Sequence, residues 1–331
     1  MGNDAKYTLP MSKRGIQMDV MCLGILCADV LVRPVDTLPK RGKLDLVDRI
    51  EMQIGGCASN AAIDICRLGG SAGIISMVGA DGFGDFVRET LTSEGVDIAG
   101  LICDPLVSTA ASIVAIGSDG ERSVMHCLGS NAFFNVNALR RELFENARAL
   151  LIAGTFLMPA FDGPGTVAAL KMGREYNLLC CLDTAWDAQG RWMNVLKPAL
   201  PLLDWFMPSF DEAAMLAESE DVADIAETFI RLGCKNTVIK LGEQGCYVRA
   251  EDGSRFFSPG YSVSAVDTSG AGDSFCAGFI MGLLAGWPLT ECAAFANAVG
   301  AMCVCSVGTT TGIRTLEETH AFIKRNALPP P

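Results

Sequence analysis

Histidine is nearly absent from this sequence, which holds only His126 and His320 in 331 residues. Two histidines so far apart exclude a zinc site built on a His-x-x-x-His pair and most schemes of Ser-His catalysis. The sequence also contains no G-x-x-x-x-G-K-[ST] stretch, so a phosphate loop of the Walker A type is missing. Chemistry that depends on these devices is therefore excluded.

Charged residues are also few, at 19%, and they give a net charge of −12. This charge argues against nucleic acid, which is bound by basic surfaces. Half of the residues are apolar, but no uninterrupted apolar run reaches the roughly 18 residues of a membrane span. Residues 1–17 lack the apolar segment of a secretory signal peptide. We therefore expect a cytoplasmic protein with neither a membrane nor a nucleic-acid partner.

Cysteine is abundant, with 14 residues, but no two stand in C-x-x-C spacing. Most of them lie in apolar runs, such as the run that contains Cys180 and Cys181. For a cytoplasmic protein this pattern favours reduced, buried thiols over disulfides.

Short β-rich runs alternate with longer helical patterns along most of the chain. This alternation is typical of βαβ units, which build an α/β fold with a mostly parallel sheet and helices on both faces. The sequence predicts strands near residues 18–26, 73–78, 149–153, 178–183, 205–207 and 237–241, and helices near 60–68, 83–94, 138–147, 166–176, 211–216, 225–232, 272–284, 290–303 and 316–325.

Two segments interrupt the alternation. Residues 35–54 and 108–127 carry strand patterns with no helix between the strands. Each segment is too small to bury a core alone, so we expect them to form one β-sheet flap whose apolar face covers a ligand, a second subunit or both. The core would then comprise residues 18–34, 55–107 and 128–328, and we expect a homodimer through the flap.

The most informative stretch runs from Asp267 to Phe275 and reads Asp-Thr-Ser-Gly-Ala-Gly-Asp-Ser-Phe, directly before an apolar run typical of a buried helix. The small residues Gly270, Ala271 and Gly272 would let backbone N–H groups face an anion at the helix N-terminus. A carboxylate at Asp273 makes sense there if it takes a proton from an attacking hydroxyl. The simpler alternative is an Asp that caps a core helix.

A second motif lies about two hundred residues earlier, where Gly55 and Gly56 are followed by small residues and by Asn60 in a helix that ends in Leu-Gly. In this order the two motifs resemble the signatures of the PfkB, or ribokinase-like, carbohydrate kinases, and the resemblance covers residues 19 to about 323. It implies a ribokinase-like fold in which the flap is a lid. It also implies ATP-dependent phosphorylation of a hydroxyl, a primary alcohol, of a sugar or sugar-like compound, with Asp273 as the base.

The resemblance assigns acceptor binding to Asp29, Gly55, Gly56 and Asn60. Asp29 follows the first predicted strand, at the strand end where ligands bind in open α/β sheets. Its carboxylate would accept two neighbouring sugar hydroxyls. The ordinary alternatives are a solvated turn residue at Asp29 and a simple hinge at the glycine pair.

On the nucleotide side, the resemblance assigns the strand end and turn at Lys240, Gly242 and Gly245 to the nucleotide phosphates and ribose. Turns of this Gly-x-x-Gly type are common, so the pattern alone is weak. Asn297, in the helix after the anion turn, would line the adenine pocket. Its ordinary alternative is a polar helix residue that caps a neighbour.

Phosphoryl transfer develops charge that a cation must offset. The metal motif of the family, Asn-x-x-Glu, matches residues 209–212, where Glu212 is kept and Ser209 replaces Asn. We expect Glu212 to bind Mg²⁺ through water. Many relatives also bind a monovalent cation beside the anion turn, and the resemblance would assign Asp267, Ser269 and carbonyls near residues 304–309 to K⁺.

One stretch imitates a dinucleotide site. Residues 163–168 match G-x-G-x-x-A, and Asp183 follows about twenty residues later. The preceding strand is predicted to end near residue 153, however, and an NAD site needs its first glycine directly after the strand. We therefore do not expect NAD.

The identity of the acceptor stays open at this level. Cys57 and Cys27 stand where ribokinase carries Lys and Asn, which argues against ribose. A nucleoside kinase of the same fold is an alternative to a sugar kinase. A sugar-binding regulator without catalysis is a third reading, against which the intact turn and Asp273 argue.

Overall fold

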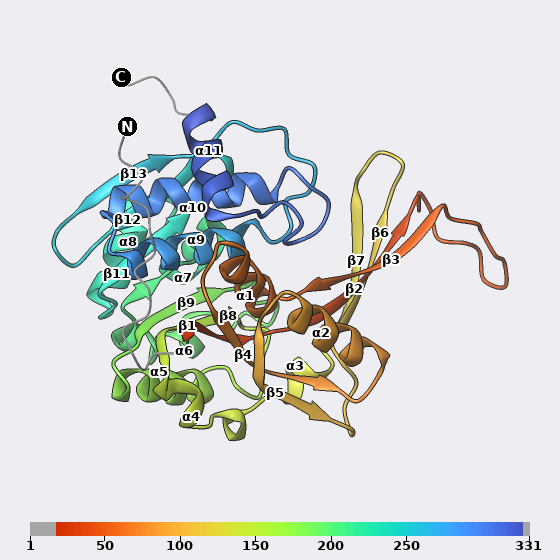
Figure 1. Cartoon of the computed structure of the whole chain (residues 1–331), viewed down its shortest axis with the longest axis horizontal. Helices are drawn as coiled ribbons and strands as arrows, with labels where there is room; N and C mark the ends of the chain where they lie inside the picture. The colour runs from red at the N-terminus through yellow and green to blue at the C-terminus, as the bar shows by residue number, and fades with distance from the viewer. Residues whose placement is uncertain (1–17, 327–331) are drawn as a thin grey trace.

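The computed structural model describes residues 18–326. Most of these residues form one large β-sheet and the helices that pack against it (Figure 1). Its nine strands lie in the order β13-β12-β11-β10-β9-β8-β1-β4-β5. The strands from β11 to β5 pair in parallel, whereas β12 pairs antiparallel with both β11 and β13. The strands span Met18–Gly24 (β1), Ala72–Gly79 (β4), Asp97–Asp104 (β5), Ala147–Thr155 (β8), Leu179–Thr184 (β9), Trp205–Phe206 (β10), Asn236–Lys240 (β11), Gly245–Arg249 (β12) and Arg255–Pro259 (β13).

Helices cover both faces of this sheet, because successive side chains of a strand point to opposite faces. In β1, Val20 and Cys22 pack into the core that contains α1, α9 and α10, whereas Met21 and Leu23 pack into the core that contains α5, α7 and α8. The α-helices span Cys57–Arg67 (α1), Gly82–Ser93 (α2), Ser130–Phe133 (α3), Glu142–Glu145 (α4), Pro164–Glu175 (α5), Met193–Leu196 (α6), Phe210–Ala217 (α7), Val222–Arg231 (α8), Ala271–Ala285 (α9), Leu289–Cys303 (α10) and Leu316–Asn326 (α11).

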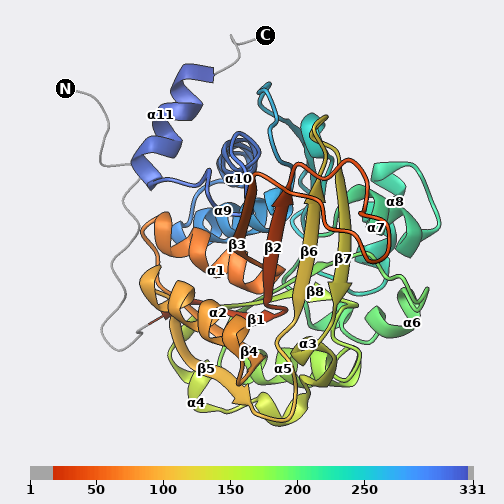
Figure 2. The same cartoon turned by 90° about the vertical axis from the view of Figure 1, so that its right-hand side faces the viewer.

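Four further strands form a separate small sheet in the order β3-β2-β6-β7, seen face-on in Figure 2. They span Cys27–Arg33 (β2), Arg49–Gly55 (β3), Ala111–Ile116 (β6) and Arg122–Cys127 (β7). Strands β2 and β6 pair in parallel, and the two outer strands are antiparallel to their neighbours. The small sheet projects from one side of the large sheet (Figure 1).

The small sheet begins earlier in the chain than the sequence predicts. We assigned residues 18–34 to the core, but β1 ends at Gly24 and β2 pairs only within the small sheet. The junction consists of Ile25 and Leu26, which are buried like the strand before them, so the apolar pattern gives no sign of the change of sheet. Asp29 follows the carboxyl end of β1, as predicted, but it lies inside β2 and not in a turn.

The α/β class and most predicted elements are confirmed, with one helix as the main exception. The helix predicted near residues 138–147 is broken into a 3₁₀ turn at Val136–Ala138 and the short α4, and β8 already begins at Ala147. The segment that imitates a dinucleotide site does not follow a strand directly, since β8 ends at Thr155 and α5 begins at Pro164.

All 14 cysteines lie among residues 18–326 and are free thiols. Within the same residues, no helix is both long enough and apolar enough to cross a membrane. The prediction about a targeting segment in residues 1–17, and residues 327 and 328 of the predicted core, lie outside the described residues.

Candidate active site

The glycine-rich turn leads directly into α9, whose first residue is Ala271. Gly270 has a φ of 77°, and a Cβ at this position would lie 2.3 Å from the carbonyl oxygen of Thr309, so the turn admits glycine alone. Ser274 donates the first helical hydrogen bond, to the carbonyl of Gly270. The N–H groups of Gly272 and Asp273 precede this bond and have no helical acceptor, which suits an anion.

Asp273 lies in the first turn of α9 with 9% of its surface exposed. Its Oδ2 accepts a hydrogen bond from the Nδ2 of Asn60 in α1 at 2.8 Å, so the two sequence motifs meet at one point. The Oδ1 of Asn60 accepts from the hydroxyl of Thr309 at 2.8 Å, which fixes the orientation of the amide. Burial raises the pKa of Asp273, and the Asn60 bond and the Lys240 charge offset this only in part. The carboxyl group is therefore a stronger proton acceptor than one on the surface.

Lys240 ends β11 and points its ammonium group toward the anion turn. The Nζ lies 2.8 Å from both carboxylate oxygens of Asp183, and a Cβ built on Gly272 would lie 3.2 Å from it. Burial lowers the pKa of Lys240, but the charge and hydrogen bond of Asp183, together with Cys276 and Glu212, outweigh burial, so the pKa is raised. Burial raises the pKa of Asp183 to about 7, with Lys240 opposing and Glu212 reinforcing the rise.

Glu212 lies in the first turn of α7 and joins this charge cluster. Its Oε2 accepts hydrogen bonds from the hydroxyl of Thr184 at 2.9 Å and from the backbone of Ser209 at 3.2 Å. Ser209 and Glu212 form a capping box, so serine serves as the N-cap at the position where the family carries Asn. Sequence reasoning did not assign Asp183 or Thr184 to the site, although an acidic residue at the end of a buried strand is a usable signal.

The acceptor residues lie where β2 and β3 meet. Gly56 has a φ of 99°, and a Cβ there would meet the backbone of Ile25 and Leu26, so this position requires glycine. A Cβ on Gly55 would stand 2.1 Å from the Oδ2 of Asp29, so a larger residue there would displace the carboxylate. The Cys27 thiol donates to the Oδ1 of Asp29 at 3.1 Å, and burial raises the pKa of this thiol. Asn60, predicted to bind the acceptor, donates a hydrogen bond to Asp273. Asn60 can therefore connect the predicted acceptor site with the predicted base.

Two further polar residues lie in the same row of the small sheet as Asp29. Asp29 pairs with Ser112 of β6, and Ser112 pairs with His126 of β7. The Ser112 hydroxyl lies 3.0 Å from the Nδ1 of His126 and 3.3 Å from the Cys27 sulfur. The sequence assigned no binding role to His126 and gave no signal for Ser112.

On the predicted nucleotide side, Gly242 begins a 3₁₀ turn with a φ of 59°, and Gly245 follows with a φ of 105°. A Cβ on Gly245 would lie 2.1 Å from the carbonyl oxygen of Ser258. The Nδ2 of Asn297 in α10 donates to the carbonyls of Ser258 and Pro259, each at 3.1 Å. The amide thus holds the end of β13, and its role toward adenine stays a prediction.

The two residues predicted for K⁺ are in contact with the small sheet. Asp267 forms an ion pair with Arg122 of β7, and Ser269 accepts a hydrogen bond from the same guanidinium at 2.8 Å. Sequence reasoning did not identify Arg122 at all. Among residues 18–326, no group of three or more His, Cys, Asp or Glu side chains is arranged to enclose a metal ion.

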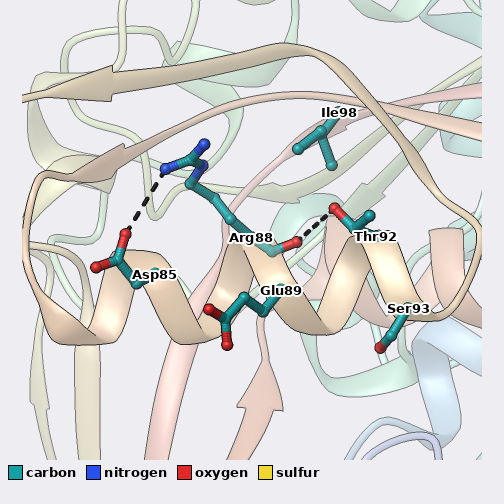
Figure 3. A pocket seen from close by; sticks show the side chains of 6 residues that line it. All are labelled: Asp85, Arg88, Glu89, Thr92, Ser93 and Ile98. Atoms are coloured by element: carbon teal, nitrogen blue, oxygen red, sulfur yellow. Dashed lines mark hydrogen bonds and ion pairs between the residues drawn. The ribbon is translucent and has the colours of Figure 1, made fainter.

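One surface hollow has no part in this arrangement. It measures about 390 Å³ and lies against α2 and β5, as Figure 3 shows. Arg88 in its wall pairs with Asp85 at 3.6 Å, and Thr92 donates to the backbone of Arg88. None of the predicted site residues lines it, so it carries no chemistry for the site above.

Comparison with known proteins identifies the family. Residues 17–316 match the model of the pfkB family of carbohydrate kinases. The chain is 26% identical over 322 residues to the 5-dehydro-2-deoxygluconokinase of Clostridium beijerinckii, covering 93% of each chain. It is 28% identical to the aminoimidazole riboside kinase of Salmonella typhimurium, over 83% of this chain and 89% of that one.

A solved structure with the same fold is a putative ribokinase II from E. coli, with a TM-score of 0.81, 23% identity and coverage of 93% of this chain and 99% of the other. The chain belongs to the pfkB family of carbohydrate kinases. It is therefore a sugar or nucleoside kinase, a phosphotransferase with an alcohol group as acceptor.

Proposed function

We propose that this kinase transfers the γ-phosphoryl group of ATP to a hydroxyl, a primary alcohol, of a sugar or sugar-like acceptor. The observation that carries the proposal is the contact between Asn60 and Asp273 at the N-terminus of α9. This contact brings the buried Asp273 carboxylate, the Gly-Gly motif that contains Asn60 and the N–H groups at the start of α9 into one site. An Asp that only capped a core helix would have no need of a partner 213 residues away.

Each step of the transfer has a group in place. The Asp273 carboxylate removes the proton of the attacking hydroxyl. The backbone of the turn Gly270, Ala271 and Gly272 holds the oxygens of the transferred phosphoryl group, and Lys240 adds a positive charge beside it. Asp29, Gly55, Gly56 and Asn60 hold the acceptor so that its hydroxyl points at Asp273.

The nucleotide would lie across Lys240, Gly242 and Gly245, with Asn297 near the base. No three acidic side chains of the described residues enclose a metal ion, but Mg²⁺ commonly keeps several waters and is bound by one or two carboxylates together with substrate phosphates. The buried Asp183 and Asp273 and the half-buried Glu212 carry more negative charge than Lys240 offsets, which leaves a place for such an ion. Such a surplus of negative charge and oxygen ligands suits a hard divalent cation. Glu212 is the residue that would hold Mg²⁺ through water, and the ion would offset charge on the phosphates.

The small sheet would serve as the lid over the acceptor, because Asp29, Ser112 and His126 face the site from it. Closure would exclude water that could otherwise attack ATP. On the opposite face of the same sheet, Met52, Ile113 and Met125 form one cross-strand row and are 43–52% exposed. We extend the proposal to a homodimer that covers this face.

An acceptor panel tests the proposed reaction. ATP consumption is measured with neutral sugars, sugar acids and nucleosides, and the phosphorylated product is identified by mass spectrometry. We expect a neutral or acidic sugar to give the highest kcat/KM. A riboside as the best acceptor would favour the nucleoside alternative, to which the similarity to an aminoimidazole riboside kinase points. No turnover with any acceptor would support a non-catalytic role.

A further inference from the structure

A single arginine ties the tip of the β6–β7 hairpin to the anion turn. Arg122, the first residue of β7, donates from its Nη1 to the Ser269 hydroxyl at 2.8 Å and forms a close ion pair with Asp267 through its Nη2. The Asp267 side chain is 1% exposed and that of Arg122 is 26% exposed. The pair is therefore largely shielded from water, and its charges interact more strongly than those of a surface pair. Figure 2 shows the hairpin standing over the core.

The carboxylate of Asp267 is fully engaged by this arrangement. Its Oδ1 accepts the N–H of Ser269 at 2.9 Å, and its Oδ2 accepts the N–H of Gly308 at 2.7 Å in addition to the guanidinium. Burial would raise the pKa of Asp267, but these donors lower it below its ordinary value, so the group stays ionised. A K⁺ ion at the same oxygen would face the positive charge of Arg122.

Some of the backbone carbonyls predicted as further K⁺ ligands also accept hydrogen bonds. The carbonyl of Val304 accepts the N–H groups of Val266 and Asp267 at 2.7 and 3.2 Å. The carbonyls of Ser269 and Thr309 accept from the thiol of Cys303 at 3.4 and 3.2 Å. The residues present therefore do not fit a monovalent cation, because Arg122 already supplies the positive charge at the Asp267 carboxylate.

We propose that Arg122 takes the place of a monovalent cation beside the anion turn, and that the turn is complete only when the small sheet is docked on the core. The proposal rests on the assignment of this turn to phosphoryl transfer. Arg122 acts as a positioning residue, because it holds Asp267 and Ser269, which precede the N–H groups that face the phosphoryl oxygens. The positive charge beside the anion turn is therefore present only when the small sheet is closed over the acceptor. Phosphoryl transfer then does not require K⁺.

Hydrogen exchange of the ligand-free protein tests the positioning role independently of any activity. Arg122→Gln removes the charge and keeps the length of the side chain. Arg49→Gln is the matched control, because Arg49 pairs only within the small sheet, with Glu51, among the described residues. We expect exchange at residues 266–270 to become about tenfold faster in Arg122→Gln, as loss of a charge-assisted hydrogen bond predicts, and to stay unchanged in Arg49→Gln. Unchanged exchange in both variants would overturn the proposal.

Calorimetry with AMP-PNP and Mg²⁺ tests the replacement of the cation. Binding is compared in KCl and in tetramethylammonium chloride at equal ionic strength. We expect wild-type affinity to agree within about twofold between the salts, whereas Arg122→Ala loses about tenfold in tetramethylammonium and regains part of it in KCl. A wild-type protein that binds more than about tenfold tighter in KCl would overturn the proposal. Absence of binding in both salts would instead contradict the nucleotide role, and the exchange result would still decide on Arg122.

Discussion

At the scale of single residues, the candidate site is defined by a cluster of charges in which Asp183 and Asp273 are buried and Glu212 and Lys240 are partly buried. Asp183, Glu212 and Asp273 lie close enough to interact electrostatically, and Lys240 forms its ion pair with Asp183. Burial keeps the pKa of Asp273 above that of an ordinary carboxyl. A base with a raised pKa accepts a proton more readily, so the same burial that costs stability serves catalysis.

The raised pKa of Asp273 predicts the pH dependence of the reaction. Only the ionised carboxylate accepts a proton, so kcat/KM should fall as the pH falls through this raised pKa, well before an ordinary carboxyl would be protonated. The measurement is a profile of kcat/KM from about pH 3.5 to about pH 9. Asp85→Asn, on the exposed face of α2, should keep the acid limb. An acid limb that lies no higher than the ordinary pKa of an aspartate, about 3.9, would contradict the assignment.

Single residues were predictable from the sequence where a short motif carries them. Asp273 and Asn60 each stand in a local pattern of glycines and small residues, and the structure brings them together. Arg122 lies 147 residues from its partner Ser269, and no pattern around it differs from that of a surface arginine. Its contact depends on how the small sheet lies on the core, which local patterns do not encode.

At the scale of elements, the anion turn depends on a close approach between two loops. Gly270 must accept a positive φ and lie against the carbonyl of Thr309, and Gly308 in the same loop has a φ of 103° and faces the side chain of Gln53. The turn, the loop after α10 and the end of β3 therefore hold one another. These contacts hold the turn in the conformation that the proposed anion binding at the N-terminus of α9 would need.

Replacing Gly270 by Ala adds two costs, the strain of a positive φ and the clash of the new Cβ with the Thr309 carbonyl. A control with the strain alone shows how much the clash contributes. Gly253→Ala is the matched control, because Gly253 has a φ of 90° and open space around its Cβ position. We expect the control to lose about 1–2 kcal/mol of unfolding free energy and to keep its activity. Gly270→Ala should lose about 1–3 kcal/mol more, because its Cβ meets the Thr309 carbonyl, and should lose most of its kcat. Equal urea midpoints for the two variants would refute the close packing.

The sequence predicted elements well where apolar spacing is unambiguous, as in α9 and α10. It did not separate β1 from β2, because buried residues continue through the junction. It also did not predict β5, in which exposed and buried residues mix, or β12 and β13, which form a short antiparallel edge. The break in the helix near residue 138 reflects tertiary packing, since Phe144 of the short α4 is fully buried beside β8.

At the scale of the whole molecule, the small sheet presents two different faces. One carries Asp29, Ser112 and His126 and is the face proposed to cover the acceptor, and the other exposes an apolar row of Met52, Ile113 and Met125. A sheet of four strands with an uncovered apolar face is expected to pack against something else. The sequence predicted this general design from the two β-rich segments, although it placed one of the four strands in the core.

The proposed dimer predicts that one added negative charge on the apolar row of the small sheet separates the two subunits. Wild-type protein at about 50 μM should elute as a dimer with light-scattering detection, and Ile113→Asp should elute as a monomer, because it would bury like charges across the interface. Leu106→Asp is the control, since Leu106 is 91% exposed and lies outside the small sheet. A monomeric wild type, or an Ile113→Asp variant that stays dimeric, would contradict a dimer through this face.

The most direct test of the whole account is single-turnover phosphoryl transfer by Asp273→Asn, with the best acceptor of the panel. The control is Asp64→Asn, because Asp64 is fully buried, bonds to Ser274 next to the base, and has a pKa raised by burial well above its ordinary value. We expect Asp273→Asn to transfer about 10²–10⁴-fold more slowly with little change in ATP affinity, and Asp64→Asn to stay within about threefold of wild type. An Asp273→Asn variant that keeps more than about a tenth of the wild-type rate would contradict the role of Asp273 as the base.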